Sequence, residues 1–279
     1  MKKINEKIGF YTPPFPRVQT YLDMLDTAQY FGVSAVEPIN FFDFSVPDKE
    51  LAKRIKEKAD EKNIVIPCFS MYINLAEGEK EDLLQTLKAY ADVASILKSP
   101  FLHHTIVNEH NEPDKVVPYK KELMKRGIEL VREIYDYAGE LGIKTVYEDQ
   151  GYIFNGVENF GEFLSTVNRD VGVVADFGNI HQSKDSIEDF INAFSDRIVH
   201  VHLKDVIMKN DNEDGKGLLS LSGLYMNEVQ IGKGSVNFEK CIGILKNIGY
   251  DGYYSIECGA SSDNSPAVTE MLEYVRNLI

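Results

Sequence analysis

The feature of this sequence that most constrains its fold is a regular alternation of short β-rich runs with longer segments whose apolar residues recur at helical spacing. The alternation persists from end to end of the chain and predicts repeated βα units. The predicted strands are Lys7–Tyr11, Ala35–Pro38, Ile64–Ser70, Phe101–Ile106, Lys144–Glu148, Gly172–Asp176, Ile198–Leu203 and Gly252–Glu257. Eight such units in 279 residues predict an α/β fold, a single (β/α)8 TIM barrel, because such barrels typically run to about 250 residues.

Helical patterns follow the predicted strands, and their ends carry the expected signals. The predicted helices are Val18–Phe31, a segment from Pro47 and Asp48 to Asn63, Lys80–Leu97, Pro118–Leu141, Val157–Val167, Ser186–Phe194, Phe238–Ile248 and Ser265–Leu278. A proline followed by an acid suits a helix start. Gly32, Gly142 and Gly249 each fall just past a helical pattern, where a glycine in the left-handed region would end the helix.

No linker rich in proline, glycine or serine divides the chain, so residues 1–279 are predicted to form a single domain. The alternative, an open doubly wound sheet, normally has a glycine-rich phosphate turn after its first strand, and Tyr11-Thr12-Pro13-Pro14 is nothing like one. The longest irregular stretch runs from Asp205 to Asn237, and loops of this length are usually functional or mobile.

The charge balance bears on the partners of the chain. Thirty Lys and Arg against 44 Asp and Glu give a formal net charge of −14, which argues against a surface that binds nucleic acid by neutralising phosphates. Cys68, Cys241 and Cys258 suit neither a disulfide framework nor a Cys-rich zinc site, and we interpret them as core thiols in a reducing compartment. No window approaches the roughly 18 apolar residues of a membrane span. We therefore predict a cytoplasmic protein that binds neither nucleic acid nor membranes, and a homo-oligomer stays open.

Several predicted strands end in a side chain that can bind a metal ion. They are Glu37, His104, Glu148, Asp176, His202 and Glu257. Because the carboxyl ends of barrel strands open onto the active-site face, the residues of the last four strands would converge at one mouth. Three carboxylates and one imidazole suit Mn²⁺, Mg²⁺ or Co²⁺ better than a thiolate-binding ion. For any one of the acids alone, capping of the following helix is the alternative interpretation.

Other polar and aromatic residues have two interpretations each. His200 points to the same side of its strand as His202 but lies one layer deeper, so we predict a packed, hydrogen-bonded core histidine. The turn Gly232-Lys233-Gly234-Ser235 is able to present backbone N–H groups to an anion, although a flexible turn is favoured and no phosphorylated substrate is inferred. Four aromatic residues after the first three strands either wall a sugar pocket or belong to the core: Tyr11, Phe15, Phe42 and Tyr72.

The segments VVADFGN, RIVHVHLKD and IGKGSVNFEKCIGILKNIGYDGYYSIE resemble the sugar phosphate isomerase/epimerase family, the xylose isomerase-like barrels that include ketose 3-epimerases, inosose dehydratases and type IV endonucleases. GVSAVEP and TVYED also match its second and fifth strands, so the resemblance covers most of the chain. The metal ligands that it implies are the four that the strand ends indicate independently: Glu148, Asp176, His202 and Glu257. The predicted cofactor is therefore a divalent metal ion, with Mn²⁺ favoured and Mg²⁺, Co²⁺ or Zn²⁺ as alternatives.

Three further residues are candidates for binding a substrate. Many family members carry a histidine three residues after the metal-binding aspartate, whereas this chain has Asn179 there. His181 follows two residues later and is either a substitute or a surface-loop histidine. Lys204, in the HLKD pattern, either anchors a substrate oxygen or pairs with a neighbouring acid.

The resemblance implies an enzyme that isomerises or epimerises a sugar, either a ketose or a related polyol ketone. Such an enzyme removes a proton next to a carbonyl, and a metal ion acting as a Lewis acid stabilises the enediolate. In the family's epimerases two glutamates act on opposite faces of the substrate. In this sequence those would be Glu148 and Glu257, with Glu37 or His104 orienting hydroxyls.

Three alternatives stay open at the level of the sequence. An inosose dehydratase-like or keto-sugar lyase uses the same metal site and the same deprotonation, and then loses a β-substituent. A type IV endonuclease-like nuclease needs further zinc ligands, so Glu37, His104 and His181 would have to be recruited together, and the net charge disfavours it. A non-catalytic sugar-binding barrel would leave the full set of four ligands without a reason.

Overall fold

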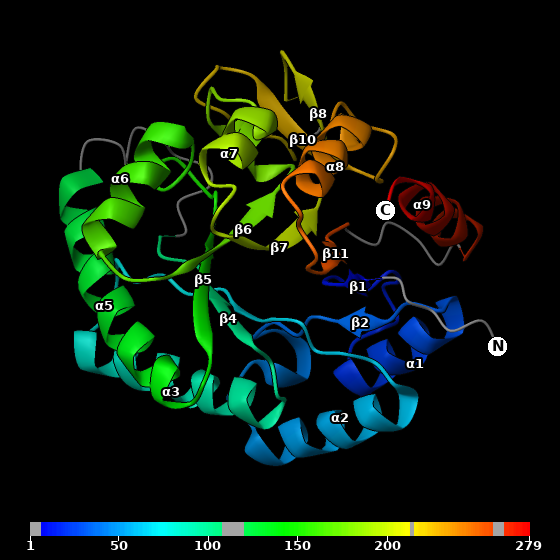
Figure 1. The fold of residues 1–279 in the computed structure, drawn as a ribbon, viewed down its shortest axis with the longest axis horizontal. Helices are drawn as coiled ribbons and strands as arrows, with labels where there is room; N and C mark the ends of the chain where they lie inside the picture. The colour runs from blue at the N-terminus through cyan, green and yellow to red at the C-terminus, as the bar shows by residue number, and fades with distance from the viewer. Residues whose placement is uncertain (1–6, 108–119, 213–214, 259–264) are drawn as a thin grey trace.

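The main strands of this chain form one closed parallel sheet. The computed structural model describes residues 7–107, 120–212, 215–258 and 265–279. Within them an eight-stranded sheet is paired in the order β2-β1-β11-β7-β6-β5-β4-β3 (Figure 1). Its strands are β1 Ile8–Phe10, β2 Ala35–Val36, β3 Phe69–Met71, β4 Phe101–His104, β5 Lys144–Glu148, β6 Gly172–Asp176, β7 Ile198–Leu203 and β11 Tyr254–Ile256. Two isolated parallel bridges, Ala35 to Val65 and Ile39 to Ser70, join the two ends of this order, so the predicted barrel is confirmed.

Helices surround the sheet as an outer ring (Figure 1). They are α1 Tyr21–Phe31, α2 Lys49–Lys62, α3 Lys80–Ile96, α5 Lys120–Glu140, α6 Val157–Val167, α7 Ile187–Ala193, α8 Phe238–Asn247 and α9 Ser265–Leu278. The helix predicted from Pro118 begins in residues outside the described part of the chain. Helix α1 begins three residues later than predicted because the Thr20 side chain caps it, and it ends at Gly32 in the left-handed region, as expected.

Several strands are shorter than predicted, and the largest difference in a strand boundary lies where proline interrupts the pairing. The third strand was expected over Ile64–Ser70, but β3 begins only at Phe69. Pro67 has no N–H group to donate to a neighbouring strand, so the residues before it contribute only the isolated bridge at Val65. Strands β5, β6 and β7, which carry three of the predicted ligands, have the predicted bounds.

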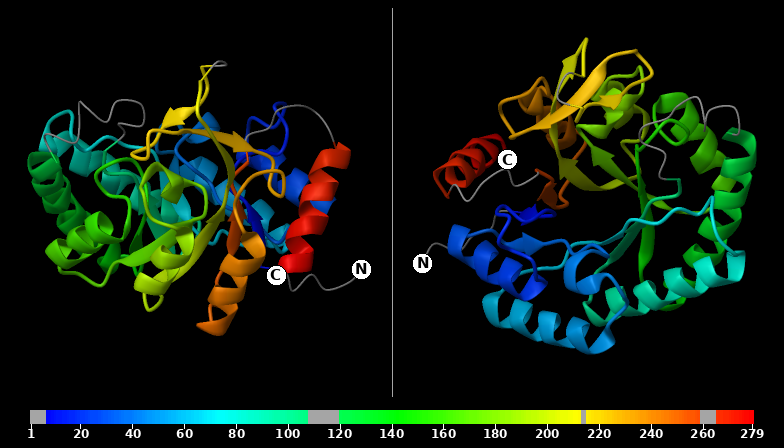
Figure 2. Two further views of the ribbon diagram at one scale, coloured as in Figure 1. Left: turned by 90° about the horizontal axis from the view of Figure 1, so that it is seen from above. Right: turned by 180° about the vertical axis from the view of Figure 1, so that it is seen from behind.

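The stretch from Asp205 to Asn237, which was expected to be irregular, contains a three-stranded antiparallel sheet. Its strands are β8 Asp205–Lys209, β9 Leu218–Leu219 and β10 Tyr225–Val229, paired in the order β8-β10-β9 (Figure 2). Gly223 has a positive φ of 84° and turns the chain between β9 and β10. A Ser-Gly pair between two apolar runs is a hairpin signal, so the sequence did carry a clue to this sheet.

Two buried layers fill the molecule. A large apolar core lies between strands and helices, and a separate small cluster of Cys68, Val146 and Val174, packed on Phe101 and Val199, lies inside the barrel. Alternate strand residues therefore face the two layers. Among the described helices, none combines the length and the apolar character that crossing a membrane requires.

Candidate metal centre

The four predicted ligands converge at the carboxyl ends of adjacent strands. Glu148 ends β5 and Asp176 ends β6. His202 is the second-last residue of β7, and Glu257 follows β11. One ligand atom from each lies within 4.8 Å of all the others. The His202 Nδ1 atom is 3.2 Å from Glu148 Oε2, 3.4 Å from Glu257 Oε2 and 3.9 Å from Asp176 Oδ2. The structure thus brings these side chains together, as the strand pattern predicts.

The cluster contains polar atoms that lack hydrogen bonds. Across the described ranges, Glu148 Oε2, Asp176 Oδ2 and His202 Nδ1 are buried and have no hydrogen-bond partner. Leaving one such atom unsatisfied costs about 1–3 kcal/mol, so three facing one another need a common partner. Three carboxylates and an imidazole nitrogen are a donor set for a divalent cation of the Mg²⁺ or Mn²⁺ type, and the residues fit such an ion.

The two carboxylate oxygens of Asp176 have different surroundings: one caps the following short helix and the other faces the cluster. Its Oδ1 atom accepts hydrogen bonds from the N–H groups of Gly178, at 2.7 Å, and Asn179, at 2.8 Å, at the start of the short helix η3 Asn179–Gln182. Its Oδ2 atom faces the cluster. The buried Asp149, which the sequence reasoning missed, accepts the N–H of Asp176 at 3.0 Å and so fixes the end of β6.

The side chains of the cluster have shifted pKa values because buried carboxylates lie close to one another and to His202. Burial, together with the neighbouring carboxylates, raises the pKa of Asp176 to about 8, although Lys204 opposes the rise. Burial also acts to raise the pKa of Glu257, but Lys204 and His202 hold it below its ordinary value. Burial acts to lower the pKa of His202, yet the surrounding carboxylates raise it well above its ordinary value. A divalent ion would therefore displace protons as it binds.

A cavity of about 290 Å³ opens directly above the cluster. Its lining includes Glu148 and Glu257 together with the aromatic residues Tyr11, Phe41, Phe42 and Tyr72. The ring of Tyr11 stacks on His202 at 4.6 Å between centroids. Phe15, by contrast, is buried against Phe31 and belongs to the core. Three of the four aromatic candidates thus form a wall of the cavity, and Phe41 adds to it.

A second and larger cavity, of about 470 Å³, lies around the amino-terminal side of the strands. It is lined by residues such as Pro67, Pro100 and Tyr250 and by none of the four converging ligands within the described residues. We place the site at the smaller cavity because Glu148 and Glu257, two members of the four-residue cluster, line it.

Of the substrate candidates Asn179, His181 and Lys204, two line the smaller cavity and one does not. Asn179 and Lys204 line it, and the Lys204 ammonium donates to Glu257 Oε1 and to Asn179 Oδ1, the latter at 3.2 Å. Lys204 thus pairs with a neighbouring acid while facing the cavity. His181 lies half-buried in η3, near Asp205, and is not among the residues that line the cavity.

Glu37 lies below the cluster rather than in the cavity. It is fully buried, and its carboxylate is hydrogen-bonded to Ser70, His200 and His202. The expectation that Glu37 orients a substrate hydroxyl therefore disagrees with its placement, because its oxygens already have partners. His200 is the hydrogen-bonded core histidine that the strand spacing predicts, with its Nε2 atom 2.7 Å from Glu37 Oε2.

His104 faces the layer between strands and helices, which corrects its assignment to the site. Its Nδ1 atom donates to the carbonyl of Thr105 and its Nε2 atom accepts from the hydroxyl of Tyr147, both at 2.9 Å. The neighbouring residue His103 takes the inner position instead. Its Nε2 atom lies 3.8 Å from Glu148 Oε1 and has no hydrogen-bond partner in the part of the chain that the structure describes.

The comparison with known protein families agrees with this geometry. The family model described as xylose isomerase-like TIM barrel matches residues 25–278. The chain belongs to this family. It is 26% identical over 241 residues to an inosose dehydratase of Clostridium perfringens (strain 13 / Type A), which covers 81% of this chain and 78% of that protein.

Solved structures share the barrel with this family member. A D-psicose 3-epimerase, crystallised in the presence of D-fructose, superposes with a TM-score of 0.77 at 15% identity and covers 97% of this chain and 98% of that one. A xylose isomerase-like TIM barrel protein from Mycobacterium smegmatis, in complex with magnesium, has a TM-score of 0.70 at 18% identity, over 92% and 87% of the two chains. The relatives with named activities are enzymes, and this chain is an enzyme of the same family.

The backbone amides of the glycine turn before α8 bind the carboxylate of Asp205. The N–H groups of Gly232 and Gly234 donate to Asp205 Oδ2 at 2.9 and 2.8 Å, and that of Val236 donates to Oδ1 at 3.2 Å. A Cβ atom on Gly234 would lie 2.1 Å from the Asp205 carboxylate, so the turn needs glycine there. The turn thus joins the segment before α8 to the first residue of β8, and these amides are bonded to Asp205 instead of a substrate phosphate.

Proposed function

We propose that the chain is a divalent-metal-dependent isomerase or epimerase that acts on a sugar, a ketose or a related polyol ketone. The observation that carries this proposal is the buried cluster of three carboxylates and one imidazole, with three unpartnered ligand atoms, beneath an aromatic-walled cavity. When bound, a divalent ion would stabilise the negative charge that develops on substrate oxygens as a proton leaves the adjacent carbon. The residues that would hold it are Glu148, Asp176, His202 and Glu257, with Mn²⁺ as the favoured ion.

The two glutamates are the candidates for moving the proton. Glu148 and Glu257 both line the cavity, so a substrate there would contact both carboxylates. In the proposed reaction one glutamate removes the proton from the carbon next to the carbonyl, and the other returns a proton to carbon. Lys204 would hold Glu257 in place and reach a substrate oxygen, while the rings of Tyr11 and Tyr72 would pack on the C–H faces of the sugar.

A second candidate function is a lyase that dehydrates a polyol ketone. The 26% identity to an inosose dehydratase over most of the chain favours it specifically. The first step is the same deprotonation; the electron pair left on carbon then expels a β-hydroxyl, which leaves as water after taking up a proton. The nuclease alternative is disfavoured, because His104 lies in the outer layer and Glu37 is saturated with hydrogen bonds.

Proton exchange in D₂O tests the proposal. The Mn²⁺-loaded enzyme is incubated with a panel of ketoses and inososes, and deuterium at the carbon next to the carbonyl is measured by NMR. We expect incorporation with at least one substrate, without net elimination for an isomerase and with elimination for a lyase. Glu148→Gln and Glu257→Gln, loaded with excess Mn²⁺, should lose exchange. Exchange at the wild-type rate in both variants would overturn the two-glutamate mechanism.

A further inference from the structure

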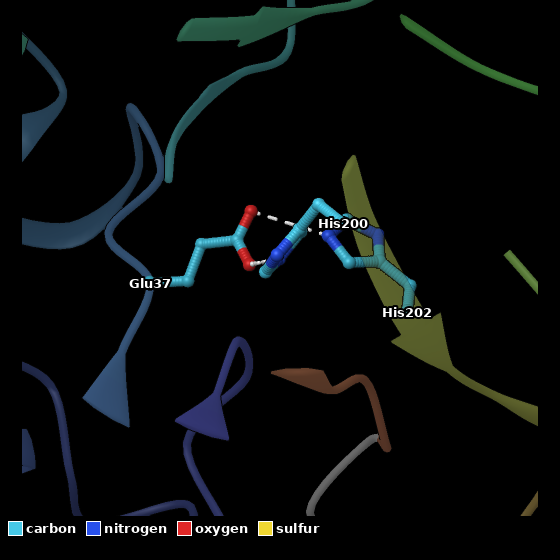
Figure 3. A group of neighbouring side chains, drawn as sticks. All are labelled: Glu37, His200 and His202. Atoms are coloured by element: carbon cyan, nitrogen blue, oxygen red, sulfur yellow. Dashed lines mark hydrogen bonds and ion pairs between the residues drawn. The ribbon is translucent and has the colours of Figure 1, made fainter. Parts of the chain in front are cut away.

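A network of buried hydrogen bonds lies beneath the metal centre and is built on one carboxylate. Glu37, which follows β2, reaches across the barrel interior to two histidines of β7 (Figure 3). Its Oε2 atom is 2.7 Å from His200 Nε2, and its Oε1 atom is 3.2 Å from His202 Nε2. Ser70 of β3 donates its hydroxyl to Oε1 at 2.7 Å. Glu37, His200 and His202 are all fully buried.

The chemistry of these groups fixes where the protons lie. A carboxylate has no hydrogen to give, so each contact requires the partner to donate. His200 and His202 must therefore each carry a proton on Nε2. An imidazole that binds a metal ion is neutral and has a single N–H group, so in the metal-loaded protein the Nδ1 atom of His202 carries the lone pair. That Nδ1 atom is the one that faces Glu148, Asp176 and Glu257.

The same reasoning extends through Ser70 to a third imidazole. The single hydroxyl hydrogen of Ser70 is given to Glu37, so its oxygen accepts from His103 Nδ1, 3.1 Å away. The Nε2 atom of His103 is then a lone pair on the side of Glu148, 3.8 Å from Oε1. One carboxylate thus sets the proton positions of three buried imidazoles around the centre.

Glu37, His200 and His202 are themselves a group of potential ligands, because one atom from each lies within 4.8 Å of the others. A second ion at this place is the weaker interpretation. The 2.7 Å between His200 Nε2 and Glu37 Oε2 is a hydrogen-bond length, and both atoms are committed to that bond. The unpartnered atom of His202 is Nδ1, on the side of the four-residue cluster.

We propose that Glu37 is a positioning residue that holds His202 in the Nε2–H tautomer and so presents the Nδ1 lone pair to the metal ion. This role rests on the proposed metal binding by the four-residue cluster. A carboxylate that accepts the second N–H of a ligating histidine orients the ring and raises its basicity. The strand pattern predicted Glu37 as a candidate, but its side chain contacts His200 and His202 beneath the cluster and does not line the cavity.

The test combines metal affinity with histidine NMR on the metal-loaded protein. Glu37→Leu removes both acceptor oxygens at similar volume, and we expect the dissociation constant for Mg²⁺ to rise roughly 10- to 100-fold, as for other partners of ligating histidines. Ser70→Ala is the matched control, because it removes a donor of the network and leaves both histidine contacts; its Mg²⁺ affinity should stay close to that of the wild type.

Glu37→Gln gives a second signature that does not depend on a large loss of affinity. The amide oxygen is expected at the Oε1 position, where it keeps the donors Ser70 and His202, so the NH₂ group faces His200. Long-range ¹H–¹⁵N spectra of the Mg²⁺-loaded variant should show His200 switched to the Nδ1–H tautomer and His202 unchanged. This readout keeps the inference testable if Glu37→Leu fails to fold.

The outcomes separate this inference from the proposed function. A wild-type protein that binds no divalent ion would overturn the proposed function and this role with it. Wild-type binding that Glu37→Leu leaves unchanged would overturn the positioning role alone. So would spectra in which His202 of the loaded wild type carries its proton on Nδ1, or in which His200 of Glu37→Gln keeps its proton on Nε2.

Discussion

The two halves of the barrel mouth carry similar residue types in different hydrogen-bonding states. At the ends of β5, β6, β7 and β11, buried ligand atoms of Glu148, Asp176 and His202 face one another without partners among the described residues. In the half formed by β2, β3 and β4, Glu37 and His104 are equally buried, but their polar atoms are hydrogen-bonded. A metal-competent residue at a strand end is therefore only a candidate, and its unpartnered atoms are what indicate a site.

The largest difference between the halves should appear when a carboxylate at the centre is neutralised. In Glu257→Gln we expect kcat/KM to fall about 10²- to 10⁴-fold, because the change removes one of the two carboxylates that we propose move the proton. Steady-state kinetics at saturating Mn²⁺, on the substrate found by the exchange screen, measures the effect. A variant that keeps near-wild-type kcat/KM would place the chemistry elsewhere in the mouth.

Removing the cation beside Glu257 should have an intermediate effect. Lys204→Met takes away the ammonium that donates to Glu257 and Asn179 and faces the cavity. A hydrogen bond to a charged group contributes about 1.5–3 kcal/mol, so we expect kcat/KM to fall about 10- to 100-fold, mainly through KM. Lys184→Met, at an exposed position, is the control. Equal kinetics in the two variants would show that Lys204 serves only to pair with its acids.

His104, in the opposite half, should affect stability instead of activity. His104→Gln disrupts the bonds to Thr105 and Tyr147 in the outer layer, so the free energy of unfolding should fall by about 1–3 kcal/mol while kcat/KM changes little. Urea unfolding and kinetics on the same samples measure both. A large loss of kcat/KM at full stability would restore His104 to the site.

A remaining prediction concerns the pH dependence of stability in the metal-free protein, which needs no substrate to measure. Because the pKa of Asp176 is raised from 3.8 to about 8, the folded state holds a proton that the unfolded state releases between those values. This contribution to stability is complete below pH 3.8 and is lost as the pH rises toward about 8, by at most about 1.4 kcal/mol per pH unit. In EDTA, the free energy of unfolding should therefore decline more steeply with rising pH in the wild type than in Asp176→Asn. Parallel curves for the two proteins would contradict the raised pKa of Asp176.

The same comparison shows which features of the fold and of the site the sequence could predict. Strands β5, β6 and β7 were predicted to the residue, since apolar runs ending in Glu148, Asp176 and Leu203 leave little freedom. The convergence of four ligands followed from barrel topology alone. Their atom-level arrangement did not, because hydrogen bonds across the barrel, such as that from Glu37 to His200, join residues 163 positions apart.

The assignment of His104 was wrong for a physical reason. A strand buried on both faces gives no hydrophobic alternation, and in β4 both Phe101 and Leu102 are apolar, so the sequence cannot tell whether His103 or His104 points inward. The three-stranded sheet after Asp205 is a different case. Its Ser-Gly turn was visible, but its strands lie outside the barrel pattern.

Calorimetric titration of the EDTA-treated wild type and of Asp176→Asn with Mn²⁺ tests the central claim most directly. Asp176 is the proposed ligand that both ends β6 and faces the cluster, so Asp176→Asn would remove an anionic ligand while the turn hydrogen bonds can persist. The account predicts one ion per wild-type chain and an affinity for Asp176→Asn that is lower by more than the roughly 10- to 100-fold of an indirect partner. Equal affinity in the two proteins, or no binding by the wild type, would contradict it.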